Sequence, residues 1–328
     1  MRNYLSSRHE SANVSRTVHY LHAQLIHIVS TMQQSSVYQP RIRARTSRHA
    51  IRGINYSVRE WGDPAAPVLI YLHGWADTAA TFQFVVDELC SDWRVIAPDW
   101  RGFGDSHGPV ASYWFADYLA DLDLLLDLFS PDAAVPLAGH SMGANVAGLY
   151  AGVMPERVSA FINMEGFGLP DTKPAEAPER YRQWLAAGRK SSAFSRYRDF
   201  AALAARIASR NPRLSPAKAE FVARCWAVQQ GTELVLRADP LHKLPNPVLY
   251  RRAEAEACWR NVQAPVLLVA GSDSDIARRL GGSVDAGLDS LPFPDASRVV
   301  LDDAGHMLHF DAPAALADTI SGFLAKTL

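Results

Sequence analysis

A serine flanked by glycines carries the clearest chemical signal in the sequence. Residues 139–143 read Gly-His-Ser-Met-Gly, a G-x-S-x-G pentapeptide centred on Ser141. An apolar run of strand length, 133–138, precedes the pentapeptide, and a run rich in small apolar residues, 144–153, follows it. Strand, tight turn and helix together expose a serine hydroxyl at a helix N-terminus, where backbone N–H groups and the helix dipole favour a developing anion. We therefore predict that Ser141 is a nucleophile.

Further apolar runs mark the elements that must position this turn. The runs expected to form strands are 54–62, 67–72, 93–98, 158–164, 264–270 and 297–301. Continuous runs such as 67–72 are typical of parallel strands buried on both faces. The segments expected to be helical are 78–89, 112–130 with Ser112 as N-cap, a helix beginning at Ser215-Pro216, and 313–324. The acidic residues of 112–130 that fall mostly off its apolar stripe are expected to face solvent: Asp117, Asp121, Asp123 and Asp127.

Composition indicates a folded protein with no general affinity for polyanions. Of the 328 residues, 48% are hydrophobic and 20% are charged, which permits a large core. The formal net charge is -1, so neither nucleic acid nor an anionic membrane is expected as a partner. The apolar patch 21–29 is too short for stable membrane insertion. Cys90, Cys225 and Cys258 lack metal-ligand spacing and are expected to be buried, reduced thiols of a cytoplasmic protein.

The chain divides by composition into an arm, a core and an insertion. Residues 1–48 are rich in Arg, His, Ser and Gln, and we expect a disordered or loosely ordered extension, with Met32 as an alternative natural start. Strand-like rhythm fills 49–167 and returns in 263–328, which together should form the core. Between them, 168–262 is helical in pattern with Pro-rich joints, and we expect an inserted helical cap.

Four motifs in this order resemble those of the α/β-hydrolase superfamily, and the resemblance covers residues 52–328. The motifs are His73-Gly74-Trp75, the segment 99–106, the turn at Ser141, and Gly305-His306 after the last strand. The resemblance implies an α/β-hydrolase fold, with a mostly parallel central sheet, flanking helices and the order nucleophile, acid, histidine. The segments 165–168 and 236–240 further resemble the serine-hydrolase-like group of this superfamily.

A serine nucleophile needs a base, and His306 fits that task. A histidine on the loop after the last strand can swing beside Ser141 and take its proton. His309 is the near rival, but it lies three residues later in an expected helix and should point elsewhere.

The acid that orients the base has two candidate positions. In most of the superfamily the acid follows the strand expected at 264–270, in a Gly-x-x-Asp pattern. In this sequence that position holds Ser274, flanked by Asp273 and Asp275. An aspartate here could also form an Asx-turn after the strand.

The second position is the end of the strand expected at 158–164. Met164-Glu165 stands there and resembles the acid of haloalkane dehalogenases. Those enzymes use an aspartate nucleophile, so Ser141 disfavours dehalogenation and epoxide opening. We predict Glu165 as the acid and keep Asp273 and Asp275 as alternatives.

The remaining expectations concern the oxyanion and the substrate. The resemblance implies an oxyanion hole made of the backbone N–H groups of Trp75 and Met142, with His73 supporting the loop. Trp75 could also line the pocket, and aromatic residues of the cap should line an apolar acyl or alcohol pocket.

We predict a carboxylesterase-like serine hydrolase that cleaves an ester, thioester or lactone of a small to medium apolar substrate through an acyl-enzyme. The alternatives are C–C or amide hydrolysis on the same fold, and a non-catalytic ligand-binding protein. No cofactor or metal is expected, and a homodimer is left open.

Overall fold

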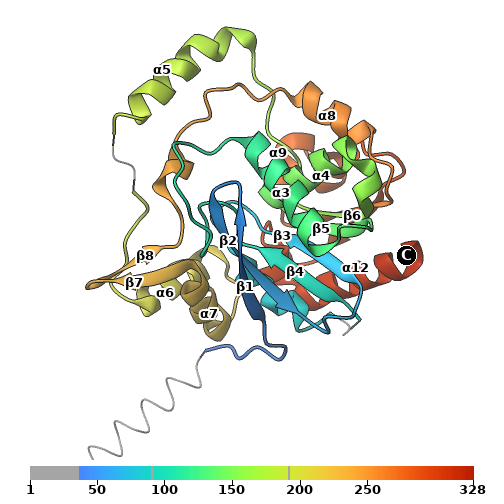
Figure 1. Ribbon diagram of the computed structural model, residues 1–328, viewed down its shortest axis with the longest axis horizontal. Coiled ribbons are helices and arrows are strands. Elements are labelled where there is room, and N and C mark those ends of the chain that lie inside the picture. Colours follow the sequence, from blue (N-terminus) through green and yellow to red (C-terminus); the bar gives the residue numbers. More distant parts are fainter. Residues whose placement is uncertain (1–36, 90–91, 191–192) are drawn as a thin grey trace, which may run out of the picture.

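The computed structural model of the chain describes residues 37–89, 92–190 and 193–328. Within them, an eight-stranded sheet has the strand order β1-β2-β4-β3-β5-β6-β9-β10 (Figure 1). The pairs β1–β2 and β2–β4 are antiparallel, and every later pair is parallel. The sheet is therefore mostly parallel, as the resemblance implies.

The strands follow the apolar runs of the sequence. Their bounds are β1 (Arg45–Ile51), β2 (Ile54–Trp61), β3 (Val68–Leu72), β4 (Arg94–Pro98), β5 (Val135–His140), β6 (Val158–Met164), β9 (Val266–Gly271) and β10 (Ser297–Leu301). Strands β5 and β9 are buried along their whole length. Because both faces of such strands are covered, their side chains alternate between two cores instead of between core and solvent.

Helices cover both faces of the sheet. On one face lie α3 (Phe115–Phe129), α4 (Met142–Val153) and α8 (Arg252–Arg260), with α9 (Asp275–Gly281) and α10 (Val284–Asp289) beyond them. On the other face lie α2 (Gln83–Val86), α11 (Leu308–Asp311) and α12 (Pro313–Thr327). The short 3-10 turns are η1 (Ala79–Phe82), η2 (Pro155–Arg157), η3 (Pro174–Glu176) and η4 (Pro240–Lys243). The last helix runs to Thr327, three residues past the expected end.

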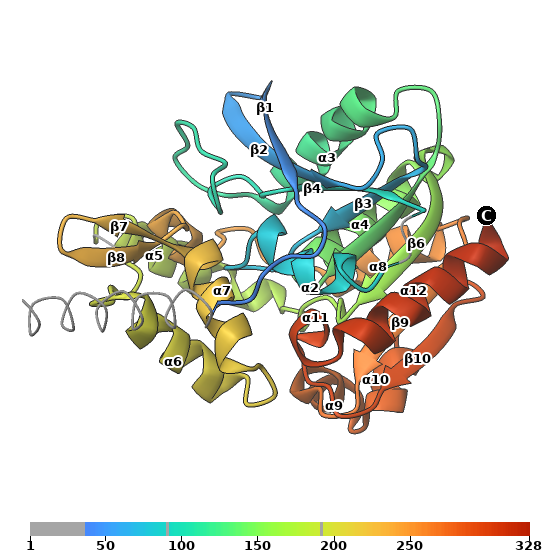
Figure 2. The same ribbon diagram turned by 90° about the horizontal axis from the view of Figure 1, so that it is seen from below.

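The segment 168–262, expected as a helical cap, contains a strand pair as well as helices. Its helices are α5 (Ala177–Ala187), α6 (Phe200–Arg210), α7 (Pro216–Trp226) and α8. The strands β7 (Ala227–Gln230) and β8 (Glu233–Leu236) pair antiparallel, which corrects the expectation of a purely helical insertion. Helices α6 and α7 pack in a smaller core that also includes Phe84 of α2 and Phe310 of α11, and Figure 2 shows the two helices with β7 and β8 to one side of the main sheet.

The core includes residues that the sequence assigns to the N-terminal extension. Strand β1 pairs with β2 along its whole length, and Tyr38 Oη donates a 2.5 Å hydrogen bond to Asp87. Residues 37–48 therefore belong to the core, which corrects the extension expected at 1–48. The sequence gives no clear signal for β1, because most of this edge strand is exposed and its apolar residues do not recur at regular spacing. Residues 1–36 and Cys90 lie outside the described residues.

The helix expected at 112–130 also differs at its start. It begins at Phe115, and Ser112 caps nothing: its hydroxyl accepts a 2.6 Å hydrogen bond from the indole N–H of Trp114. Asp121 is buried instead of solvated, because Tyr56 and Arg101 both donate hydrogen bonds to its carboxylate. No helix among the described residues is both long enough and apolar enough to cross a membrane.

Candidate active site

The turn at Ser141 has the geometry expected of an exposed nucleophile. Strand β5 ends at His140 and helix α4 begins at Met142, so Ser141 alone forms the corner, with φ 51° and ψ −113°. This backbone conformation is rare for a residue with a side chain, and such strained residues often cluster at functional sites. A Cβ on Gly143 would lie 2.1 Å from the carbonyl oxygen of Leu72, so only glycine fits there.

Three side chains from separate parts of the chain meet at this corner. His306 Nε2 lies 3.1 Å from Ser141 Oγ, and His306 Nδ1 lies 3.1 Å from Glu165 Oε2. Both distances are within hydrogen-bond reach. In this arrangement Nδ1–H donates to the carboxylate, which leaves the Nε2 lone pair facing the serine hydroxyl. The histidine can therefore accept the serine proton.

Glu165 is held in place by more than the histidine. It follows β6 directly, has a positive φ of 61°, and its side chain is fully buried. Its Oε1 accepts a 2.9 Å hydrogen bond from the Gly271 N–H, and its Oε2 accepts a 2.6 Å hydrogen bond from Ser274 Oγ. A buried carboxylate needs such partners to remain charged. Ser274, which occupies the usual acid position, thus supports Glu165, the acid predicted at the other position.

The alternative acids lie elsewhere. The exposed Asp273 forms ion pairs with Arg213 and Arg278. Asp275 is exposed in the first turn of α9. Within the described residues, Glu165 is the one carboxylate hydrogen-bonded to His306.

The two expected oxyanion donors border the same corner. The backbone N–H groups of Trp75 and Met142 make no backbone hydrogen bond within the described part of the chain. A Cβ on Gly74 would lie 3.3 Å from Ser141 Cβ, which shows how closely this loop approaches the nucleophile.

His73 holds in place the loop that carries Gly74 and Trp75 beside Ser141. Its Nδ1 donates to the Gly74 carbonyl at 2.7 Å, and its Nε2 accepts from the Trp100 N–H at 2.8 Å. Burial lowers the pKa of His73, which is consistent with this neutral tautomer.

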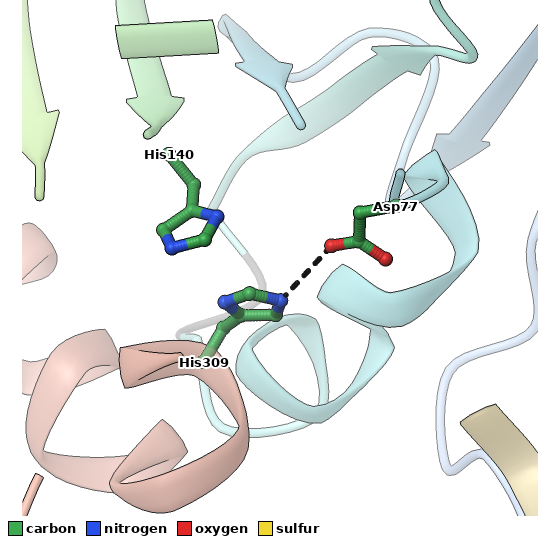
Figure 3. Close-up of side chains that lie close together, drawn as sticks. All are labelled: Asp77, His140 and His309. Atoms are coloured by element: carbon green, nitrogen blue, oxygen red, sulfur yellow. Dashed lines mark hydrogen bonds and ion pairs between the residues drawn. The ribbon is translucent and has the colours of Figure 1, made fainter. Parts of the chain in front are cut away.

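A second buried cluster, which sequence reasoning missed, contacts the loop that carries His306. Asp77, His140 and His309 place one ligand-type atom each within 4.8 Å of one another, and Figure 3 shows the bond between His309 and Asp77. Such a trio could ligate a metal ion. Here Asp77 already accepts hydrogen bonds from His309 Nε2 at 3.2 Å and from Trp226 Nε1 at 2.7 Å. His140 Nε2 donates to the His306 carbonyl at 2.8 Å. We interpret the cluster as a hydrogen-bonded support.

The electrostatics of this support follow from its burial. Burial lowers the pKa of His140 well below its usual range, and the neighbouring histidines His309 and His306 act in the same direction. For Asp77 burial alone would raise the pKa, but the hydrogen bond and charge of His309 outweigh it and lower the pKa to about 2. Asp77 is therefore a carboxylate and His140 is neutral near pH 7. His309 faces Asp77 and not Ser141, as expected.

A cavity of about 520 Å³ is lined by Ser141 and His306. Ser141, His306, Trp75 and Asp77 line it from the core, and the cap closes it with Phe194, Tyr197, Leu203, Ile207, Trp226 and Leu236. Trp75 is half exposed, with its ring centroid 6.4 Å from that of Phe103 and 6.1 Å from that of Phe194. The cavity has the size and apolar lining of a small-molecule site.

Comparisons with known proteins agree with this fold. The family model of the α/β hydrolase fold matches residues 67–313. The chain is 30% identical to a 3-hydroxybutyrate-oligomer hydrolase of Cupriavidus necator, over 79% of this chain and 89% of that protein. It is 26% identical to a serine hydrolase-like protein of Danio rerio, over 80% of this chain and 83% of that protein. Among solved structures, the thioesterase domain from the curacin biosynthetic pathway is similar, with a TM-score of 0.76 and 26% identity, covering 85% of this chain and 99% of that domain.

Proposed function

The chain belongs to the α/β-hydrolase family, and on that premise we propose that it is a serine hydrolase that cleaves carboxylic esters or thioesters through an acyl-enzyme. The observation that carries the proposal is the continuous relay from Ser141 Oγ through His306 to Glu165, with 3.1 Å at each step. A relay of this kind activates a hydroxyl that is otherwise a weak nucleophile at neutral pH.

In the first half of the proposed reaction, Ser141 Oγ attacks the substrate carbonyl carbon while His306 Nε2 takes the hydroxyl proton. Glu165 fixes the histidine tautomer and stabilises the imidazolium that forms. The carbonyl oxygen becomes an oxyanion facing the N–H groups of Trp75 and Met142. His306 then protonates the leaving alcohol or thiol as the carbonyl–heteroatom bond breaks, which leaves the acyl group on Ser141.

In the second half, water replaces the leaving group. His306 takes a proton from that water as its oxygen attacks the acyl carbon, and returns the proton to Ser141 Oγ as the acid is released. The apolar lining from the cap suits an acyl chain of small to medium length. The names of two relatives, an oligomer hydrolase and a thioesterase domain, support this bond class. The cytoplasmic location and the homodimer stay predictions.

The direct test is a panel of p-nitrophenyl esters, lactones and an acyl thioester, assayed with wild type and Ser141→Ala. We expect wild type to turn over at least one class and Ser141→Ala to lose on the order of 10⁴–10⁶ in kcat. Ser195→Ala is the matched control, because Ser195 lines the same cavity. Its kcat should stay within about twofold of wild type. If Ser141→Ala stays within tenfold of wild type on every substrate, the serine mechanism is wrong.

A further inference from the structure

The cap side of the cavity carries three cationic side chains: Arg206, Arg210 and Lys243. We propose that they bind a carboxylate on the substrate, remote from the scissile carbonyl, so that the site selects acyl chains with an acidic far end. This inference rests on the proposed function and names its substrate class.

The two arginines are presented by one helix face. Arg206 and Arg210 stand four residues apart on α6 and therefore project on the same side of the helix. Leu203 and Ile207, from the same helix, line the same cavity, so this face of α6 is turned towards Ser141. Lys243 approaches from η4, where its Nζ donates a 2.5 Å hydrogen bond to the Ala193 carbonyl and lies 4.4 Å from the Phe194 ring centroid.

Arg206 and Arg210 differ from neighbouring arginines in having no acidic partner among the residues that the structure describes. Arg213, Arg224 and Arg237, also from the cap, each form an ion pair with an aspartate or glutamate. Within the described residues, neither Arg206 nor Arg210 does so. A guanidinium presents a planar fork of N–H donors that matches a carboxylate in two-point geometry. The fork is therefore available to a ligand.

The cavity lining also carries little negative charge that could pair with these cations in place of a substrate. Among its described lining residues Asp77 is the sole carboxylate, and it accepts hydrogen bonds from His309, Trp226 and Thr81. Three cations against one engaged carboxylate make the cavity positive, although the whole chain has a formal net charge of -1. A positive, concave surface concentrates anionic substrates and orients them.

Apolar side chains line the same cavity as the cations. Leu203, Ile207 and Leu236 line the space that also opens to Ser141. A ligand that reaches Ser141 and also pairs with the cations must carry an apolar chain with the scissile carbonyl at one end and a negative charge at the other. A half-ester or thioester of a dicarboxylic acid has this chemistry.

The test compares two esters that differ only in that charge: the mono-p-nitrophenyl ester of suberic acid and the same compound with its free carboxyl methylated. For wild type we expect KM to be roughly 3–10-fold lower for the acid, with kcat similar, because exposed ion pairs contribute modestly. The preference should shrink in about 1 M NaCl, where charges are screened over about 3 Å.

Variants locate the effect on α6. The double variant Arg206→Gln/Arg210→Gln should raise KM for the acid by roughly 3–10-fold and leave the methylated ester within twofold. Arg182→Gln/Arg189→Gln is the matched control, because it also removes two positive charges, from exposed cap residues outside the cavity lining. It should change neither KM. Equal KM for the two esters in wild type, or equal shifts for both in the double variant, would overturn the inference.

A binding experiment tests this inference independently of the proposed reaction. Calorimetry of Ser141→Ala with monomethyl suberate and with dimethyl suberate requires no turnover. We expect the monoanion to bind more tightly than the diester, and we expect this difference to vanish when Arg206→Gln/Arg210→Gln is added to Ser141→Ala. That result supports the carboxylate-binding subsite even if no ester is hydrolysed. Equal binding of the two rejects the subsite, while Ser141-dependent turnover of the methylated ester would leave the proposed function standing.

Discussion

Glu165, on the sheet side of the cavity, is fully buried and accepts three hydrogen bonds, whereas Arg206, on the cap side, is exposed and has no ion pair among the described residues. The sheet side fixes each reacting group through a neighbour that is itself packed. The cap side presents long, weakly held side chains over an apolar wall. We infer that the sheet side sets the chemistry and the cap side sets the choice of substrate.

The two sides differ in the same way in their cores. The sheet side rests on two large apolar cores, one on each face of the sheet. The cap has a smaller core around α6 and α7, which it shares with Phe84 and Phe310 of the sheet side. Polar contacts such as the Trp226 bond to Asp77 and the Arg237 ion pair with Asp105 also join the two sides. Because the proposed reacting groups stand on the sheet side and the proposed binding groups on the cap side, changes on the sheet side should alter kcat, and changes on the cap side should alter KM.

The largest expected effect is at the base. His306→Ala should lose on the order of 10⁴–10⁶ in kcat, and the double variant with Ser141→Ala should be little worse, because the two residues act as one unit. His309→Ala is the control three residues further along the chain, in α11, and should remain far more active. Steady-state kinetics on one ester checks this. A crippled His309→Ala beside an active His306→Ala would show that the base is misassigned.

The next effect is at the acid. Glu165→Gln should keep the fold and lose roughly three to four orders of magnitude in kcat, since the amide no longer stabilises the imidazolium or its tautomer. Asp273→Asn and Asp275→Asn should each cost little, because neither carboxylate contacts His306. The measurement is kcat for the three variants on one ester. A dead Asp273→Asn or Asp275→Asn with a working Glu165→Gln would reverse the assignment.

A smaller effect is expected where the acid is supported. Ser274→Ala removes the 2.6 Å hydrogen bond to Glu165 and also the N-cap of α9, so we expect roughly tenfold lower kcat and about 1 kcal/mol lower stability. Ser272→Ala, two residues away, is the matched control. Kinetics well below the unfolding midpoint separates the two losses. If kcat is unchanged while stability falls, Ser274 caps the helix and does not position the acid.

The last prediction concerns the stability of the junction between cap and sheet side, where we expect no change in catalysis. His242 of η4 stacks between Phe103 and Tyr113, with ring centroids 3.8 Å and 3.6 Å away, and burial lowers its pKa to about 4. Between pH 6.5 and 4, His242 binds a proton in the unfolded chain but stays largely neutral in the folded chain. The free energy of unfolding should therefore fall as pH falls, by at most about 1.4 kcal/mol per unit from this residue.

Denaturant unfolding at several pH values tests this. His242→Gln cannot titrate, so its stability should change less steeply between pH 6.5 and 4, whereas the exposed His107→Gln should follow wild type. Parallel curves for wild type and His242→Gln would show that the junction is not pH-sensitive.

The sequence predicts the sheet side far better than its supports. Ser141 and His306 stand in local motifs whose glycines and flanking strands are visible in the chain itself. Glu165 is recognisable because Ser274 replaces the expected acid, but nothing local shows that Ser274 would donate to Glu165. Contacts between residues more than 100 positions apart depend on the fold, and so does the cluster of Asp77, His140 and His309.

Two further features escape sequence reasoning for related reasons. Strand β1 is an edge strand whose apolar residues are too few to give a period, so its pairing with β2 decides its structure. Asp121 looks like part of a solvated helix face, yet Tyr56 and Arg101 reach it from other elements. Polar residues buried by distant partners carry no local signal.

The most direct test of the central claim is covalent labelling of the nucleophile with a fluorophosphonate, read by intact mass and by mapping of the modified peptide. The relay predicts one adduct per chain on Ser141. It also predicts no adduct in Ser141→Ala and labelling slower by several orders of magnitude in His306→Ala, because the hydroxyl is then not activated. An adduct on another residue, or no adduct on a preparation that hydrolyses esters, would contradict the account.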